Sequence, residues 1–426
     1  MDQTLITGKD APLEETIDRA TSQLHHLGIE VKTSNWLNPA PHCWSVHIEC
    51  SSCPALYTNG KGTSREASLA SGLGEFFERL STDFFFAEYS LQSNSEISKR
   101  LPFRFHPEEK WFTRANGDSA FNTSNKNAQI LTPQLQSFYD PDGELSFTNL
   151  LDNNLDDNKR GIATLPFKSV DTEEIVYFPV SLLNNLYVSN GMAAGNSPAE
   201  CNSQALSEII ERFVKFKILQ ESIALPDIPR SALNSFPHLC AIIDCLQTDS
   251  FIIRLKDASL GGQFPVICAL LIDTTSGGTF ASFGCNCRFE TALERTLTEL
   301  LQGRQLDQLR NFAPPTHDTS LVADPFNLES HFIDSDGMIS WRILRDQPDY
   351  SFTPWDFKGT TTEELNLLTN IVKKSGHNTY RAEYKHCGIY CCRLLVPGLS
   401  EIYPVDDLIW NNRNRGTDLR PQLLTL

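Results

Sequence analysis

Three separate segments of the chain place polar residues four and seven positions apart, and five of these residues are glutamates. The segments are Ser71-x-x-x-Glu75-x-x-Glu78-Arg79, Gln204-x-x-x-Glu208-x-x-Glu211-Arg212 and Arg295-x-x-x-Glu299-x-x-Gln302. Residues at i, i+4 and i+7 share one face of an α-helix, so each segment would present a polar stripe. Converging carboxylates are costly unless a cation neutralises them, and glutamate oxygens are suitable ligands for Mg²⁺.

Two explanations of these stripes differ in function. A single segment of this kind is usually a solvated helix face with local Glu–Arg pairing. Three copies in phase favour a metal–nucleotide site, because Mg²⁺ takes one or two protein carboxylates and completes its shell with water and phosphate oxygens. Arg295 stands where the other copies have Ser71 and Gln204, and it would bind a phosphate that bridges the ions. No G-x-x-x-x-G-K-[ST] sequence is present, which excludes a Walker site.

Each stripe is expected on a helix that follows a strand and a turn of small residues. The expected strands are Ala55–Thr58, Leu186–Val188 and Thr279–Ser282. The leucines two residues before the central glutamates are Leu73, Leu206 and Leu297. At about 100° per residue, this offset puts each glutamate nearly opposite the apolar face of its helix. The helices would therefore pack through their leucines and turn their glutamates to a common space, and the glycine-rich turns would let the backbone approach a ligand.

The remaining pattern indicates one elaborated α/β (α+β) domain. Residues 1–54 are expected to supply a helix that Gly28 ends and a strand at 44–49, as part of the same domain as residues 55–426. A loop-rich insertion, crowded with Asn, Asp, Gly and Ser, is expected near 115–160. No low-complexity linker divides the chain into independent halves.

The composition excludes several classes of function. The chain has 426 residues, with 36 Lys and Arg against 53 Asp and Glu and a formal charge of −17, which disfavours direct binding to nucleic acid or to anionic membranes. No apolar run approaches the roughly 20 residues of a membrane helix. The first residues have neither a basic nor an apolar signal region, so the expected location is the cytoplasm.

The twelve cysteines are expected to be reduced thiols, many of them small core residues. Cys50 and Cys53 have C-x-x-C spacing, but no second pair at suitable spacing completes a zinc site. Cys285 and Cys287 precede the third helix, and a nucleophilic role is conceivable there, although no histidine partner is identifiable. Their roles stay open at this point.

The chain resembles the YcaO family, whose ATP-binding pattern is built from such Ser-x-x-x-Glu, Gln/Ser-x-x-Glu and Arg-x-x-x-Glu helices. The resemblance runs across nearly the whole chain. Its segments include Gly8-Lys9-Asp10, Trp36-Leu37-Asn38-Pro39, Thr58-Asn59-Gly60-Lys61-Gly62, Tyr187-Val188-Ser189-Asn190-Gly191, Asp257-Ala258-Ser259-Leu260-Gly261-Gly262 and Leu300-Leu301-Gln302-Gly303-Arg304.

The resemblance implies ATP and Mg²⁺ as cofactors and assigns roles to nine residues. It implies that the glutamates are metal ligands, with Glu78 and Glu211 as further ligands or nucleotide contacts: Glu75, Glu78, Glu208, Glu211 and Glu299. It implies nucleotide or phosphate contacts for Lys9, Ser71, Gln204 and Arg295. Family members that form azolines or thioamides are thought to add a nucleophile to a peptide amide carbon, phosphorylate the oxygen with ATP and eliminate phosphate.

The chain is most similar to the stand-alone, enterobacterial-type members. These are associated with β-methylthiolation of an aspartate in a small-subunit ribosomal protein, as accessory factors to a radical-SAM methylthiotransferase. That resemblance implies this enzyme and the ribosomal protein as partners, and homodimer formation. The alternatives are a non-catalytic, nucleotide-bound scaffold and a cyclodehydratase-type enzyme.

Two departures from the family pattern concern the end of the chain. The sequence ends Arg420-Pro421-Gln422-Leu423-Leu424-Thr425-Leu426, without the proline-rich tail of the azoline-forming members, which weakens the cyclodehydratase alternative. It also stops before the helical-repeat region that usually follows the domain in the stand-alone type.

Overall fold

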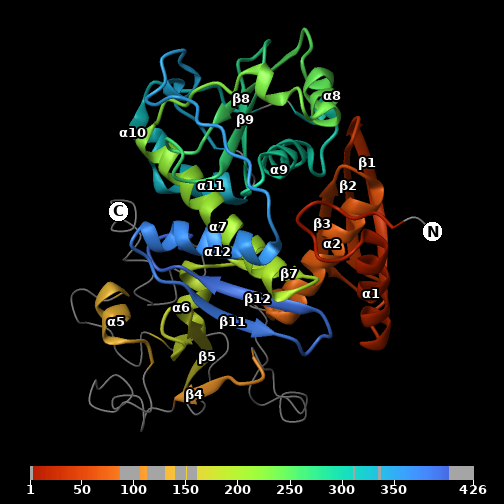
Figure 1. Cartoon of the computed structure of the whole chain (residues 1–426), viewed down its shortest axis with the longest axis vertical. Helices are drawn as coiled ribbons and strands as arrows, with labels where there is room; N and C mark the ends of the chain where they lie inside the picture. The colour runs from red at the N-terminus through yellow and green to blue at the C-terminus, as the bar shows by residue number, and fades with distance from the viewer. Residues whose placement is uncertain are drawn as a thin grey trace.

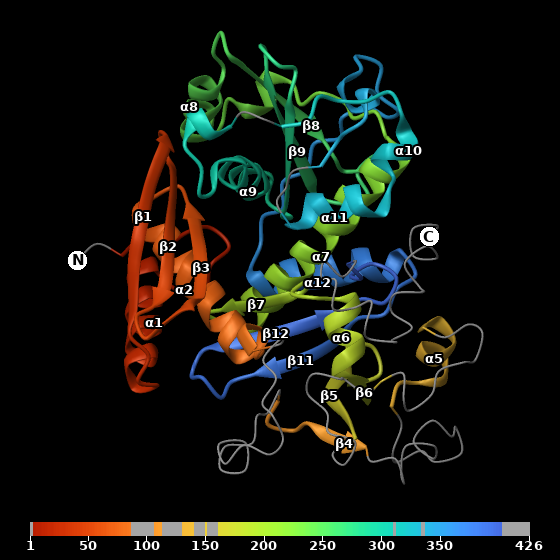
Figure 2. The ribbon, with the colours of Figure 1, turned by 180° about the vertical axis from the view of Figure 1, so that it is seen from behind.

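The structure is a computed structural model that describes residues 3–86, 106–112, 130–139, 150, 161–309, 312–333 and 337–402. Most of the insertion expected near 115–160 and the whole of 420–426 lie outside the described residues. The named strands pair in antiparallel fashion and form three sheets, with helices between and around them (Figures 1 and 2). The expected mixed α/β fold class is confirmed.

Two of the sheets have three strands each and the third has six. The N-terminal sheet has the order β1 (Val31–Ala40), β2 (Cys43–Cys50), β3 (Cys53–Gly62). The upper sheet in Figure 1 has the order β10 (Thr279–Cys285), β9 (Val266–Asp273), β8 (Phe251–Asp257). The large sheet has the order β4 (Lys110–Phe112), β5 (Ile162–Ser169), β11 (Tyr380–Tyr384), β12 (Tyr390–Leu395), β7 (Met192–Gly195), and β6 (Ile175–Pro179) pairs with β5.

The helices of eight or more residues are α1 (Leu13–His26), α2 (Arg65–Ser81), α7 (Pro198–Glu221), α8 (Pro237–Leu246), α9 (Phe289–Leu301), α11 (Pro325–Ile333) and α12 (Thr361–Lys374). The shorter ones are α5 (Pro133–Tyr139), α6 (Val180–Leu186) and α10 (Thr319–Val322). As expected, α1 ends just before Gly28, whose φ of 72° suits glycine.

Each of the three stripe-bearing helices follows an edge strand of a different sheet. Helix α2 follows β3, α7 follows β7 and α9 follows β10. Each helix packs on the strand that precedes it, while α2 also contacts β7 and α7 also contacts β10. Serine side chains at Ser64 and Ser197 cap the first two helices by accepting from Ala67 N and Glu200 N. Three sheets therefore bring one polar helix each to the middle of the molecule.

A glycine near the end of each edge strand allows the helix to cross it closely. A Cβ atom at Gly60, Gly195 or Gly284 would collide with atoms of the helix that follows the strand. At Gly60 the obstructing atoms belong to the backbone of Ser68 and Gly72. These glycines therefore let each helix pack closely on the strand that precedes it.

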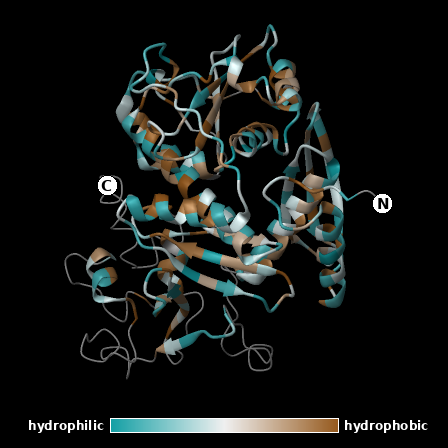
Figure 3. Ribbon diagram, in the orientation of Figure 1, coloured by the Kyte–Doolittle hydropathy of each residue, from teal (hydrophilic) through white to brown (hydrophobic). Residues whose placement is uncertain are grey.

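The apolar faces of the three helices are buried, as their phase predicts. Leu73 is 3% exposed, Leu206 1% and Leu297 0%. These leucines belong to three different hydrophobic clusters. Figure 3 shows hydrophobic residues along the strands and on the helices that pack against them. The glutamate stripes consequently face away from the sheets that anchor their helices.

One expected strand is wrong. Leu186 ends helix α6, Tyr187 and Val188 lie in the following turn, and the strand of the second unit is β7, Met192–Gly195. Pro179 precedes the helix, where its fixed φ suits a helix start, and Val188 has a φ of 48° that ends any extended run. The order of strand, turn and helix is retained with the strand displaced towards α7.

Candidate functional site

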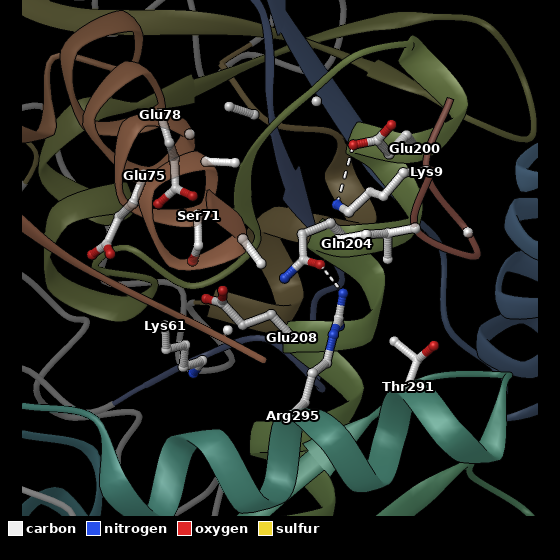
Figure 4. A pocket seen from close by; sticks show the side chains of 18 of the residues that line it. Lys9, Lys61, Ser71, Glu75, Glu78, Glu200, Gln204, Glu208, Thr291 and Arg295 are labelled. Atoms are coloured by element: carbon white, nitrogen blue, oxygen red, sulfur yellow. Dashed lines mark hydrogen bonds and ion pairs between the residues drawn. The ribbon is translucent and has the colours of Figure 1, made fainter. Parts of the chain in front are cut away.

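All nine residues selected from the sequence line one cavity of about 510 Å³ between α2, α7 and α9. They are Lys9, Ser71, Glu75, Glu78, Gln204, Glu208, Glu211, Arg295 and Glu299. Figure 4 shows Ser71, Glu75 and Glu78 on one wall, Gln204 and Glu208 on the next, and Arg295 rising from the third helix. The volume falls in the range of small-molecule sites, roughly 300–1,000 Å³. The convergence predicted from the helical phase is therefore present.

The three central glutamates each pair with a cation. Arg79 Nη2 lies 2.6 Å from Glu75 Oε1, and Arg212 Nη2 lies 3.1 Å from Glu208 Oε1. These are the i, i+4 pairs of the solvated-face explanation, but here both pairs line a cavity. Glu299 pairs instead with Lys61, which comes from β3 rather than from its own helix.

Burial and repulsion between the carboxylates outweigh the effect of the nearby arginines on the pKa values of Glu78 and Glu208. Burial raises the pKa of Glu78 well above its usual range, and Glu208 and Glu75 raise it further, against opposing effects of Arg79 and Arg212. Burial also raises the pKa of Glu208. Of its charged neighbours, Arg212 lowers this pKa and Glu211 raises it. Carboxylates in this condition gain from a bound divalent cation, which favours their charged forms.

Hydrogen bonds lock the second and third helices together at the site. Arg295 donates one hydrogen bond from Nη2 to Gln204 Oε1 and another from Nη1 to the carbonyl oxygen of Cys285, the latter over 3.1 Å. The backbone N–H of Cys285 donates to Glu211 Oε2 over 3.0 Å. The guanidinium thus lies beside the acidic residues of α7, where it provides positive charge for an anion.

The segment that carries Lys9 closes another side of the cavity. Lys9 Nζ lies 3.1 Å from Glu200 Oε1, and the backbone N–H of Asp10 donates to Glu200 Oε2 over 2.9 Å (Figure 4). Asn196 also donates to both oxygens of Glu200, which is 5% exposed. Glu200 therefore holds the N-terminal segment against the start of α7.

Several cavity residues had no role in the sequence prediction. Lys61 lies in the small-residue turn Asn59-Gly60-Lys61-Gly62, for which the sequence pattern predicted a role of the glycines and none of the lysine. Glu200 lies one helical turn before Gln204, so continuing the stripe backwards by four residues would have found it. Arg79 and Arg212 were parts of the motifs but were assigned no function. Glu294 precedes Arg295, and burial raises its pKa.

The donor set fits magnesium held partly by a ligand rather than a closed protein cage. Within the described part of the chain, no group of three or more His, Cys, Asp or Glu side chains is arranged to hold a metal ion by itself. Mg²⁺ commonly binds through one or two carboxylates and completes its shell with water and substrate phosphates. Half-buried carboxylates beside Arg295 and Lys9 suit that kind of site.

Cys285 and Cys287 are buried and do not line the cavity. All twelve are free thiols, as expected. Burial raises the pKa of Cys285 well above its usual range and that of Cys287 to about 12, so both are protonated and unreactive at neutral pH. Asp257, the first residue of the segment Asp257–Gly262 that belongs to the family resemblance, ends β8 and accepts hydrogen bonds from Ser259 N and Thr353 N, outside the cavity lining.

Comparison with known proteins agrees with the motifs. Residues 59–400 match the family described as YcaO cyclodehydratase, ATP- and Mg²⁺-binding. The chain therefore belongs to the YcaO family. It is 46% identical over all 426 residues to the ribosomal protein S12 methylthiotransferase accessory factor YcaO of Escherichia coli strain K12, of which it spans 71%.

Two solved structures share the fold. A heterocyclase in complex with substrate and cofactor gives a TM-score of 0.59 at 17% identity, with 94% of this chain and 54% of that chain covered. YcaO from Methanopyrus kandleri, bound with AMPPCP and Mg²⁺, gives a TM-score of 0.54 at 15% identity, with 94% and 93% covered. At these identities the likeness establishes the fold alone. Among the described residues, no helix is both long and apolar enough to span a membrane.

Proposed function

We propose that this chain binds ATP with Mg²⁺ in the cavity between α2, α7 and α9. The bound nucleotide would then serve β-methylthiolation of an aspartate in a small-subunit ribosomal protein. The observation that carries the proposal is the convergence of nine motif residues, from three helices and the N-terminal segment, on one cavity. The name of the Escherichia coli relative supports the ribosomal protein and its methylthiotransferase as partners.

The nine residues have two proposed roles, with the acidic residues assigned mainly to the metal and the others to the nucleotide. Glu75, Glu208 and Glu299 would hold Mg²⁺, with Glu78 and Glu211 as further ligands or nucleotide contacts. The phosphate and nucleotide contacts would be Lys9, Ser71, Gln204 and Arg295. Arg295 is preorganised for an anion, because its hydrogen bonds to Gln204 and to the Cys285 carbonyl fix the guanidinium in the cavity.

The chemistry proposed for the site is phosphorylation of a peptide amide oxygen. When bound, Mg²⁺-ATP supplies a phosphoryl group whose transfer turns that oxygen into a leaving group. The protein's own part is positioning: Arg295 and Lys9 would bind phosphate oxygens and the three helices would exclude bulk water. No side chain in the described cavity is assigned as a nucleophile.

Two alternatives each have an observation in their favour. The relative is named an accessory factor, which favours a nucleotide-bound scaffold for a radical-SAM enzyme with no turnover of its own. The family description names a cyclodehydratase, which favours an azoline- or thioamide-forming enzyme. ATP turnover separates the scaffold from both enzymes, and the product formed on the peptide separates the enzymes from each other.

The test combines Mg²⁺-ATP-dependent thermal stabilisation with phosphate release for wild type, Glu208→Gln and Glu49→Gln. Glu49 lies on β2, pairs with Lys32 and is outside the cavity, so it is a charge-matched control. We expect stabilisation and release in wild type and Glu49→Gln, with release lost in Glu208→Gln. Stabilisation without glutamate-dependent release, even with the partners added, would support the scaffold. A melting temperature that Mg²⁺-ATP leaves unchanged would refute the nucleotide site.

The proposal also covers place and partners. We place the protein in the cytoplasm and expect it to act with a radical-SAM methylthiotransferase, and homodimer formation is part of the same proposal. The formal charge of −17 disfavours direct contact with nucleic acid or membranes. We therefore expect the chain to contact the ribosomal protein itself rather than ribosomal RNA. Sedimentation of the chain alone and with the enzyme would measure both forms of association.

A further inference from the structure

Lys61 occupies an unusual position among the cations of the cavity. In the first two motifs, the central glutamate pairs with an arginine four residues later on the same helix, Glu75 with Arg79 and Glu208 with Arg212. In the third motif, residue 303 is glycine and α9 ends at Leu301, so no helical partner exists at that spacing. Lys61 takes that place from the strand of the first motif, where it pairs with Glu299.

Two contacts hold Lys61 in this position. Gln302 Nε2 donates to the carbonyl oxygen of Asn59 over 2.6 Å, which joins the end of α9 to β3 two residues from Lys61. On the strand, Lys61 is paired with Ser45 of β2. The lysine side chain is 27% exposed and that of Glu299 is 35% exposed, so the pair faces the cavity rather than the core.

The charges around Lys61 come from all three helices. Glu75, Glu208, Glu211 and Arg295 all act electrostatically on its ammonium group. In Figure 4 the Lys61 side chain lies below Glu208. A lysine on a flexible stem differs here from Arg79 and Arg212, because a single charge on four methylenes changes partner more readily than a planar guanidinium.

We propose that Lys61 is an exchangeable counter-cation: it neutralises Glu299 before the ligand binds and releases Glu299 to the divalent cation when Mg²⁺-nucleotide enters. Its ammonium group then pairs with a phosphate oxygen. This inference rests on the proposed nucleotide site and adds Lys61 to it as a contact first for Glu299 and then for the phosphate. No covalent step is involved, since one ion pair replaces another.

The proposal predicts changes of opposite sign in one variant. Lys61→Met removes the competitor for Glu299, so Mn²⁺ alone should bind about tenfold more tightly than to wild type. The same variant lacks the phosphate contact, so the non-hydrolysable analogue AMPPNP with Mg²⁺ should bind about tenfold more weakly. A merely structural lysine would weaken both, since a damaged site holds neither ligand well.

The experiment measures both dissociation constants by isothermal titration calorimetry on the full chain. Lys32→Met is the matched control, because Lys32 pairs with Glu49 at 2.7 Å on the same sheet and lies outside the cavity. It should leave both constants within twofold of wild type. If Lys61→Met does not fold, as judged by its metal-free melting curve, Lys61→Gln replaces it with the same two expectations.

The outcomes separate this inference from the function beneath it. Tighter Mn²⁺ with weaker Mg²⁺-AMPPNP supports the exchange. Wild-type binding of Mg²⁺-AMPPNP, combined with unchanged constants or a loss of both in the Lys61 variants, overturns the role of Lys61 and leaves the nucleotide site in place. Failure of wild type to bind Mg²⁺-AMPPNP overturns the nucleotide site, and the exchange with it.

Discussion

Arg295 on α9 donates a hydrogen bond to the side-chain oxygen of Gln204 on α7, so the equivalent positions of two motifs meet inside the cavity. The two residues are 91 positions apart and belong to helices anchored on different sheets. Their contact joins two of the repeated motifs inside the cavity. It also makes the guanidinium a fixed charge, since a second bond from Nη1 to the Cys285 carbonyl completes its orientation.

Arg295→Met should weaken Mg²⁺-AMPPNP binding at least tenfold, because it removes the fixed positive charge of the cavity. Arg295→Lys should recover only part of the affinity, since an ammonium group cannot bond Gln204 and the Cys285 carbonyl in the same fork geometry. Calorimetric titration measures both. Arg230→Met, at an exposed pair with Asp244, is the control. Equal affinities in Arg295→Met and the control would show that Arg295 does not contact the nucleotide.

Nucleotide binding should require divalent metal. Mg²⁺-ATP at about 100 times its dissociation constant would stabilise the folded chain by ~2.7 kcal/mol, whereas ATP with EDTA would meet uncompensated carboxylates and give little or no stabilisation. Differential scanning fluorimetry with ATP, with ATP and EDTA, and after Mg²⁺ is restored checks this dependence. An equal rise in melting temperature with and without EDTA would contradict a metal-dependent site.

Ionisation of Glu78 should cost the metal-free protein stability as the pH rises. Its pKa is raised by burial and by Glu208 and Glu75. A raised carboxyl pKa gives a contribution that is fully present below the unfolded pKa and disappears as the pH rises through the folded one. Other carboxyls titrate in the same direction, since burial raises the pKa of Glu401 to about 7.

Glu78→Gln should therefore raise the metal-free melting temperature relative to wild type once the pH is high enough to ionise Glu78 in the folded chain, by about 2 °C. The same variant should show less stabilisation by Mg²⁺-ATP, because it lacks one of the acidic groups. Melting curves in EDTA across the pH range measure the first effect. A slope identical to that of wild type would show that Glu78 ionises without cost.

The crossing of strand and helix should depend on Gly60. Gly60→Ala would place a methyl group against the backbone of Ser68 and Gly72 and cost about 1–3 kcal/mol. Gly74 lies in the same unit with open space around its Cβ position, so Gly74→Ala should be neutral or stabilise by up to ~1 kcal/mol. Urea unfolding without ligand compares the two, and equal midpoints would remove the packing argument.

The sequence predicts the cavity better than the strands. A helix stripe depends on local spacing, so the phase of Leu73, Leu206 and Leu297 predicts the burial observed and the direction of the glutamates. The strand before α7 depends on tertiary pairing: Leu186 and Tyr187 resemble a strand by residue type, but the ladder forms at Met192–Gly195, opposite β12.

The residues that the prediction missed are those whose partners are distant in sequence. Lys61 meets Glu299 across 238 positions, and no local spacing contains that pair. Glu200 acts on the backbone of Asp10 and on Lys9, both from the N-terminal segment. Arg79 and Arg212 were visible in the motifs, yet their pairing into the cavity depends on where the helices point.

The three helices that form the walls of the cavity each follow a strand of a different sheet. The cavity is therefore complete only when all three sheets have docked correctly. A chain with one sheet misplaced would still hold most of its hydrogen bonds but would have no place for the nucleotide. Ligand occupancy thus reports on tertiary assembly, and the bound ligand would stabilise the docked arrangement of the three sheets. At high nucleotide concentration, a protease that attacks transiently separated sheets should find fewer openings than in its absence.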